Sequence, residues 1–372
     1  MRGHTRVTVS LAVVLVLALG VAACGGAAPA PTAAPSKPAA APTAAPAAAP
    51  TKAPEAAPTK APEATKPAAP AAGAPALTKE YKLAMATGGT SGTYYPFGGA
   101  IAGIWSKNIK GVTVNVETTG ASVENMRLLD TKQVELAITQ NDIVDYAWNA
   151  TEMFKDKPKI QNIRGVAALY PELVQWTVVP EIKSLADLKG KRFVVGPAAS
   201  GSEANTRQIF EANGMSYKDL GKALFLSIAE SAAAFKDRQV DGWATTGGVP
   251  NPGITDVSTL QEINIVPMTG DVAKNVLDRY KFFVPATIPG GSYKGLDKDI
   301  PTIAVQATLV AREDLDADLV YWLTKTLIEK QPELAQAHAK GKVLSKESAV
   351  KGLSIPWHPG AEKYYREIGV LK

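Results

Sequence analysis

The chain is poor in the residues that disulfide, metal and acid–base chemistry need. It has one cysteine, Cys24, and three histidines, at positions 4, 338 and 358. A single cysteine excludes an internal disulfide. The sequence also contains no HExxH, CxxC or GxxxxGK[ST] motif, each of which would indicate a zinc, redox or nucleotide site. We therefore expect neither a bound metal nor a cofactor.

The sequence also lacks the residue pattern of a catalytic centre. The serine at 200 does not follow the G-x-S-x-G pattern of a nucleophile elbow, because position 198 is Ala and position 202 is Ser. His338 lies in an Ala-rich helical segment, and His358 stands between Trp357 and Pro359. We expect these histidines to have packing or docking roles, and we expect no enzyme activity and no catalytic residues.

Residues 25–76 contain no Leu, Ile, Val or aromatic residue and consist almost wholly of Ala, Pro and Thr. Such a segment has no side chains with which to form a core, and its prolines block helix and sheet alike. Semi-extended and polyproline conformations remain, and at about 3.1 Å per residue they span on the order of 150 Å. We expect residues 24–76 to be a disordered tether.

The first 23 residues have the layout of a signal peptide, with Arg2 and Arg6 ahead of an apolar stretch at 7–19. This stretch is too short for a comfortable membrane span. The sequence VAAC at 21–24 resembles a bacterial lipobox, which implies a diacylglyceryl group on Cys24 and export to the outer face of the cell membrane. The alternative is a cleaved signal peptide next to an incidental cysteine.

The net charge of +5 does not indicate a nucleic-acid partner. The signal peptide contributes +2 and the tether another +2, which leaves +1 for residues 77–372. A folded part so close to neutrality has no electrostatic footprint for a phosphate backbone. We therefore expect no nucleic acid among its partners.

From residue 77 onward, short apolar runs alternate with amphipathic segments. The expected strands are 82–86, 112–117, 134–139, 165–169, 192–195, 223–227 and 240–244, and the expected helices include 98–107, 123–129, 203–212 and 231–238. This alternation is typical of an α/β fold with parallel crossovers.

Two similar loops, 87–93 and 196–202, each follow an expected strand and precede an expected helix. Both are rich in glycine and in hydroxyl residues, which are Thr and Ser in the first loop and Ser in the second. The free N–H groups at a helix start can bind a ligand oxygen, glycine allows close approach, and hydroxyl groups add donors. The alternative is that Ser91 or Ser202 only caps its own helix. Two such loops in matching positions favour ligand contact.

Two further segments place polar residues where an expected strand ends. Ser122 is a plausible helix cap after the strand at 112–117, while Gln140 and Asp142 follow the strand at 134–139. Open α/β sheets bind ligands at such strand ends. Asp142 can pair with a ligand ammonium group or cap the next helix, and the residues alone leave both interpretations open.

The order of these motifs resembles the TAXI family of TRAP-transporter solute receptors over residues 80–370. The matching segments are ATGGTSGTYYP at 86–96, TGASVEN at 119–125, TQND at 139–142, ASGSEAN at 199–205, PGGSY at 289–293 and HPGAEKYY at 358–365. One departure is TTGG at 245–248, where the family more often has an aromatic or apolar segment.

The resemblance implies a two-lobed periplasmic-binding-protein fold of type II topology. Residues 77–178 and 288–372 would form lobe 1, and residues 179–287 lobe 2. A monomer would capture a small anionic or zwitterionic solute, such as an amino acid or carboxylate, between the lobes and dock on a TRAP permease. The implied ligand-binding residues are Ser91, Gly92, Tyr94, Tyr95, Ser122, Asn125, Gln140, Asp142, Ser200, Gly201, Ser202, Thr246 and Gly247.

A receptor of the same fold that serves an ABC importer or a sensor kinase is the alternative interpretation. The lobes and the tether would look the same in all three cases, so the residues of the folded part do not separate them.

The lipobox resemblance generates the first prediction. The variant Cys24→Ala should be released from the membrane fraction, because it lacks the thiol that would carry the lipid. Cell fractionation with immunodetection measures this, with the unchanged chain as the control. Retention of the variant on the membrane would show that Cys24 is not the anchor.

Overall fold

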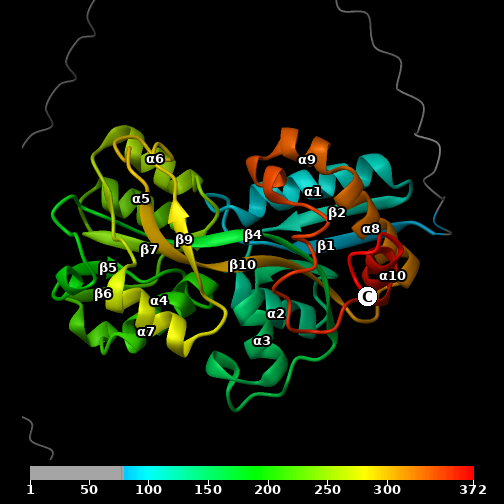
Figure 1. Ribbon diagram of the computed structural model, residues 1–372, viewed down its shortest axis with the longest axis horizontal. Helices are drawn as coiled ribbons and strands as arrows, with labels where there is room; N and C mark the ends of the chain where they lie inside the picture. Colours follow the sequence, from blue (N-terminus) through cyan, green and yellow to red (C-terminus); the bar gives the residue numbers. More distant parts are fainter. Residues whose placement is uncertain (1–76, 78) are drawn as a thin grey trace, which may run out of the picture. The chain divides into compact units, whose positions relative to one another are not determined.

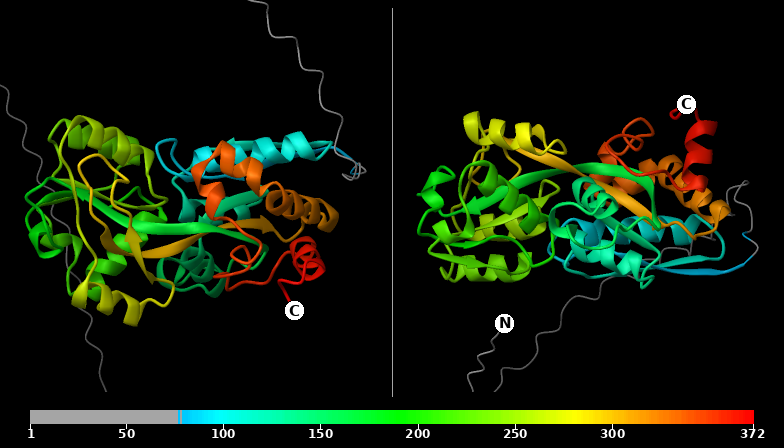
Figure 2. Two further views of the ribbon diagram at one scale, coloured as in Figure 1. Left: turned by 45° about the horizontal axis from the view of Figure 1, so that its top comes forward. Right: turned by 90° about the horizontal axis from the view of Figure 1, so that it is seen from below.

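Two long strands, β4 (Ile163–Val178) and β10 (Ile300–Arg312), run antiparallel through the centre of the molecule. The structure is a computed structural model that describes residue 77 and residues 79–372. Figure 1 shows helices and shorter strands gathered at each end of this pair, and both views of Figure 2 show the two strands side by side. The expected signal peptide, tether and lipidated Cys24 lie outside the described residues.

Lobe 1 is built on the strand order β2-β1-β3-β10-β4. Its sheet combines β1 (Tyr81–Ala86), β2 (Val112–Glu117) and β3 (Leu136–Gln140) with the first half of β4 and the last half of β10. Its helices are α1 (Tyr94–Asn108), α2 (Ser122–Asp130), α3 (Asn141–Asn149), α8 (Ala317–Glu329), α9 (Gln331–Ala337) and α10 (Pro359–Glu367), with the short turns η1 (Glu152–Phe154) and η4 (Ala339–Val343).

Lobe 2 continues the same sheet from β4 through β7 (Gly242–Gly247) and β5 (Arg192–Val194) to β6 (Lys222–Leu224). The short strand β8 (Asn264–Ile265) pairs with β4, and β9 (Val284–Ile288) pairs with β10. Its helices are α4 (Gly201–Ala212), α5 (Ile228–Lys236), α6 (Pro252–Leu260) and α7 (Gly270–Arg279), with the turns η2 (Ala186–Leu188) and η3 (Tyr217–Asp219).

The two long strands change from one hydrophobic core to the other within their own length. On β4, Tyr170 packs in the core of lobe 1 and Val174 in that of lobe 2. On β10, Val305 belongs to lobe 2 and Ala307 to lobe 1. The predicted lobe boundaries at 178/179 and 287/288 remain a proposal. The packing of the two strands would instead place the boundaries near residues 172 and 306, where each strand changes from one core to the other.

The predicted fold class is confirmed: the chain forms a two-lobed α/β fold with the expected crossing strands. Each of the seven expected strands and four expected helices corresponds to an observed element, although β4 is far longer than the expected 165–169. The sequence analysis did not predict β10. Its mostly apolar sequence does not alternate between apolar and polar residues, so it fits a buried helix as well as a buried strand. In the described part, no helix has the length and apolar character to cross a membrane.

Helix α10 lies very close to the start of α8, and Gly360 makes this approach possible. An added Cβ at Gly360 would stand 2.0 Å from the carbonyl oxygen of Ala317 and 2.5 Å from the amide nitrogen of Tyr321. Both are backbone atoms, so they cannot turn aside as the end of a side chain can. Gly99 in α1 differs, because an added Cβ there would meet nothing within 4 Å.

The variant Gly360→Ala should lower the free energy of unfolding by on the order of 1–3 kcal/mol, because the new methyl group must push two helices apart. Gly99→Ala is the matched control, and it should be neutral or stabilising by up to about 1 kcal/mol, since alanine is the better helix former. Urea unfolding followed by circular dichroism measures both. Equal effects of the two substitutions would contradict the described packing of α10 on α8.

Candidate functional site

A cavity of about 120 Å³ lies between the two lobes. Lobe 1 contributes Gly88, Gly89, Gly92, Thr93, Tyr94, Thr119, Gly120, Ala121, Ser122 and Gln140, and Glu172 comes from the crossing strand β4. Lobe 2 contributes Pro197, Ser200, Gly201, Ser202, Ser227, Ile228, Thr246, Gly247 and Asn251. Hence both Gly- and Ser-rich loops expected from the sequence reach the same cavity.

The starts of six helices surround this cavity. Helices α1, α2 and α4 begin at Tyr94, Ser122 and Gly201, α5 begins at Ile228, and Gln140 and Asn251 are the N-caps of α3 and α6. Helix starts carry free N–H groups and the positive end of the helix dipole, so they favour an oxygen-bearing or anionic ligand group.

Some of the hydroxyl groups in these loops already serve the fold. Ser200 Oγ caps α4 by accepting a hydrogen bond from the Glu203 amide, at 3.1 Å. Ser202 Oγ accepts one from the Thr246 amide at 3.0 Å, so it joins two walls of the cavity within lobe 2. The sequence left open whether Ser202 caps its own helix. The structure shows that Ser200 caps α4 and that Ser202 instead contacts Thr246.

The thirteen predicted ligand-binding residues fall into two groups. Those that line the cavity are Gly92, Tyr94, Ser122, Gln140, Ser200, Gly201, Ser202, Thr246 and Gly247. Four others, Ser91, Tyr95, Asn125 and Asp142, are not among the lining residues. Asn125 Nδ2 donates to the carbonyl oxygens of Thr87, at 2.7 Å, and Ile138, at 2.8 Å, and so holds the first loop on its strand. Ligand contact by any of the thirteen stays a prediction.

Sequence reasoning missed Glu172, which is the ionisable carboxyl group among the residues that line the cavity. It is 2% exposed and lies on β4 where the strand passes from one core to the other. A signal was present, because Glu172 is the only carboxylate in a mostly apolar strand and charged residues are rarely buried without a partner. The other missed lining residues include Thr93, Thr119, Ser227, Ile228 and Asn251.

Burial dominates the chemistry of Glu172. It raises the pKa of the carboxyl from its ordinary value to about 8, although a hydrogen bond from Tyr94 acts in the opposite direction. In that bond the Tyr94 hydroxyl donates to Oε2 of Glu172, at 2.6 Å. Tyr94 and Glu172 therefore form a buried pair at the wall of the cavity.

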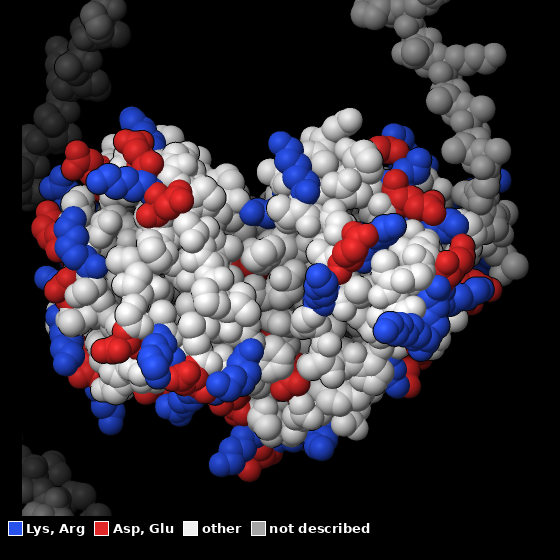
Figure 3. Space-filling view, viewed as in Figure 1, with Lys and Arg blue, Asp and Glu red and all other residues white. Residues whose placement is uncertain are grey.

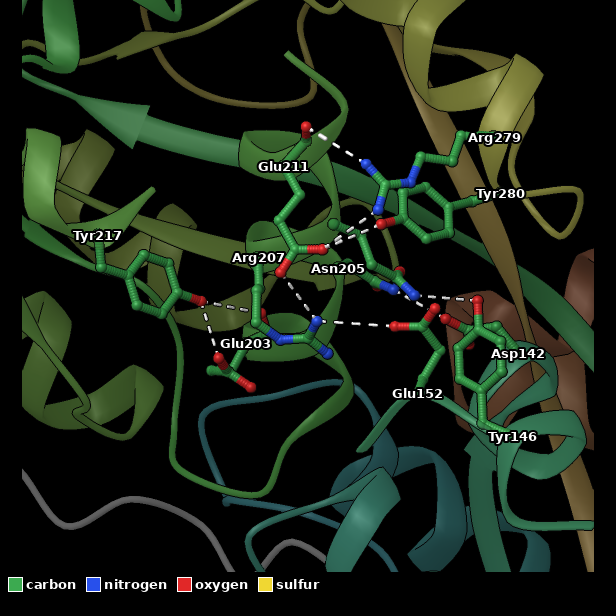
Figure 4. A network of polar contacts seen from close by, with 11 residues as sticks. Asp142, Tyr146, Glu152, Glu203, Asn205, Arg207, Glu211, Tyr217, Arg279 and Tyr280 are labelled. Atoms are coloured by element: carbon green, nitrogen blue, oxygen red, sulfur yellow. Dashed lines mark hydrogen bonds and ion pairs between the residues drawn. The ribbon is translucent and has the colours of Figure 1, made fainter. Parts of the chain in front are cut away.

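Polar contacts outside the cavity wall join the two lobes (Figure 4). Asn205 in α4 donates to Asp142 in α3 at 2.8 Å, and both side chains are fully buried. Burial also raises the pKa of Asp142 to about 7, against the effect of this hydrogen bond. Nearby, Arg207 of lobe 2 lies 3.6 Å from Glu152 of lobe 1. Asp142 thus joins the lobes and is not a wall of the cavity.

Charged side chains other than Glu172 are scarce around the cavity. Within residues 79–372, the cavity wall contains no Lys or Arg, and no cluster of His, Cys, Asp or Glu could hold a metal ion. In Figure 3 the surface on either side of the hollow between the lobes is mostly uncharged. Of the two described histidines, His338 packs against Phe97 and His358 caps α10, and neither lines the cavity.

Comparison with known families matches residues 85–369 to the NMT1-like family. The chain belongs to the NMT1-like family. The match covers nearly all of the folded part, including both loops and Glu172. The comparison names the NMT1-like family and does not name the TAXI family, so the resemblance to TAXI receptors stays a prediction.

Solved structures with distant similarity are bacterial binding proteins. The periplasmic aliphatic sulphonate binding protein SsuA from Escherichia coli has 15% identity and a TM-score of 0.44, over 77% of this chain and 82% of that one. PhnD1 from Prochlorococcus marinus, in complex with methylphosphonate, has 14% identity and a TM-score of 0.48, over 78% and 99%. These similarities are too distant for a ligand to be transferred from them.

The buried carboxyl of Glu172 generates a prediction on pH. Folding raises the pKa of this carboxyl from 4.5 to about 8. Between these two pH values the carboxyl is protonated in the folded state and ionised in the unfolded state. Stability should therefore fall as the pH rises through this range, by on the order of 3 kcal/mol from Glu172. The variant Glu172→Gln should remove that part of the fall, while its amide oxygen can still accept from Tyr94.

Urea unfolding at pH 5 and pH 8 measures this difference. The matched control is Glu181→Gln, because Glu181 is exposed in the same protein. Asp142→Asn should remove a separate part of the loss of stability with rising pH, the part that occurs below about pH 7, because burial raises the pKa of Asp142 to about 7. If Glu172→Gln loses as much stability between the two pH values as the unchanged protein, Glu172 does not titrate as a buried group.

Proposed function

We propose that this protein is an exported solute-binding receptor whose two lobes close on a small molecule. The observation that carries the proposal is the cavity whose walls come from both lobes and from the starts of six helices. A ligand there would touch both lobes at once, so its binding would favour the closed arrangement. The receptor would catalyse no reaction, and Cys24 would tether it to the outer face of the membrane as a monomer.

A membrane importer would take the solute from the closed receptor. The resemblance implied a TRAP permease as the partner, with an ABC importer or a sensor kinase as the alternative. We favour the ABC importer, because membership of the NMT1-like family does not support the TAXI assignment on which the TRAP permease depends. The tether and the two lobes suit either partner.

The solute would be small and would carry at least one oxygen-rich group. A cavity of about 120 Å³ is well below the volume of sites that hold drug-sized ligands. Helix starts and hydroxyl groups from both lobes would bind a carboxylate or similar group without an arginine. This agrees with the expected anionic or zwitterionic solute, such as an amino acid or carboxylate.

A thermal-shift screen of the full chain against amino acids, mono- and dicarboxylates, sulfonates and phosphonates tests the receptor function. A solute at a hundred times its dissociation constant should stabilise the folded state by about 2.7 kcal/mol, a shift of a few degrees. Calorimetry then gives the affinity, and the solute should be recovered chemically unchanged. If no compound of any class binds, the receptor function is wrong.

Variants at the cavity wall then test the site. Ser122→Ala in lobe 1 and Ser202→Ala in lobe 2 should each weaken binding by about 1–3 kcal/mol where a buried ligand oxygen loses a donor. Ser91→Ala is the matched control, because Ser91 is in the same loop as Gly92 but does not line the cavity. Equal affinity in all three variants would place the solute elsewhere.

A further inference from the structure

Acceptor groups gather on one wall of the cavity. The Glu172 carboxylate receives the Tyr94 hydroxyl at Oε2, and its remaining lone pairs can accept further donors. Gln140 lies beside it, since a hydrogen bond from Gln140 lowers the pKa of Glu172. Oε1 of Gln140 is buried and has no donor within the described part of the chain. Two neighbouring acceptors are therefore available for a group that the protein does not supply.

The Gln140 side chain also spans the gap between the lobes. An added Cβ at Gly201, the first residue of α4, would stand 1.8 Å from Gln140 Oε1. Gln140 of lobe 1 thus reaches the backbone of lobe 2, and only a glycine leaves room for it. This contact holds Oε1 in place at the wall of the closed cavity.

The opposite wall presents a donor without an acceptor. Asn251 Oδ1 accepts from the Gly253 amide at 3.0 Å as the cap of α6, which fixes the orientation of its amide group. Its Nδ2 is buried and has no acceptor among residues 79–372. The Tyr293 hydroxyl accepts from the Asn251 backbone amide at 2.7 Å and holds this residue at the cavity. An acceptor wall and a donor wall therefore face the same space.

One cation lies near the acceptor wall. The Lys340 ammonium group stands 5.8 Å from the ring centroid of Tyr170, and its charge favours the ionised form of Glu172. Lys340 is not among the residues that line the cavity, whereas Glu172 is. Asp142 also acts on Glu172, with the opposite sign. Glu172 is thus the ionisable group that a solute would meet directly on this wall, and an ammonium group beside it would favour the ionised carboxylate over the protonated form that burial favours.

From this arrangement we infer that Glu172 and Gln140 form an amine subsite, so that the solute carries a protonated amino group. The ammonium group would donate to the Glu172 carboxylate and to Gln140 Oε1. The oxygen-rich group of the same solute would face Asn251 Nδ2 and the helix starts of lobe 2. The inference rests on the proposed receptor function and narrows its solute to amino compounds, chiefly amino acids, with Glu172 setting the specificity.

The test uses pairs of compounds that differ only in the amino group: L-glutamate with glutarate, L-leucine with 4-methylpentanoate, and L-phenylalanine with 3-phenylpropionate. The other proteinogenic amino acids complete the panel. Calorimetry with the full chain should show at least one amino acid that binds about tenfold or more tightly than its deaminated partner, since a charge-assisted hydrogen bond is lost. This comparison needs no variant.

Two variants make the test sharper, because only one of them changes the proposed subsite. Glu172→Gln should weaken binding of the amino acid by about tenfold to a hundredfold. Glu181→Gln is the matched control, and it should leave the affinity unchanged, because it makes the same change at an exposed carboxylate outside the cavity. Circular dichroism confirms that both variants are folded.

The possible results separate the inference from the receptor function. If deaminated acids bind as tightly as their amino partners, or if Glu172→Gln binds the amino acid as tightly as Glu181→Gln does, the subsite is wrong and the receptor function stands. The same holds if only compounds without an amino group bind. If nothing binds in this panel or in the wider screen, both proposals fail.

Discussion

The architecture depends on two antiparallel strands that must leave one hydrophobic core and enter another. Along β4 the apolar side chains serve lobe 1 up to Tyr170 and lobe 2 from Leu173 onward. Glu172 lies between these two residues, buried and at the wall of the cavity. The need to connect two cores with a continuous sheet therefore places a stretch of strand between the cores, and the site is built on it.

Closure of the lobes buries polar groups that would be hydrated if the lobes were apart. Glu172, Gln140 and Asn251 are all at most 2% exposed, and two of them keep a side-chain atom without a partner among the residues that the structure describes. Each such atom costs roughly 1–3 kcal/mol when water is removed. The Asp142–Asn205 hydrogen bond offsets a part of this cost. A solute that supplies the missing donors and acceptors would offset the rest, which links ligand binding to closure.

Much of the fold could be predicted from the sequence, because alternation of short strands and helices is a local property. The two loops at 87–93 and 196–202 could be predicted for the same reason. Glu172 was missed because its position depends on where a strand passes between two cores, which is a property of packing. The different roles of Ser200 and Ser202 also depend on packing, since Ser202 finds its partner at Thr246, far along the chain.

The most direct test of the central claim is a crystal structure of the protein with a solute that stabilises it. The account predicts density for the solute between the two Gly- and Ser-rich loops, with a nitrogen atom within hydrogen-bond distance of the Glu172 carboxylate and oxygen atoms toward Asn251 and the start of α4. A solute bound outside this cavity, or one that places a carboxylate against Glu172 and its amino group elsewhere, would contradict it.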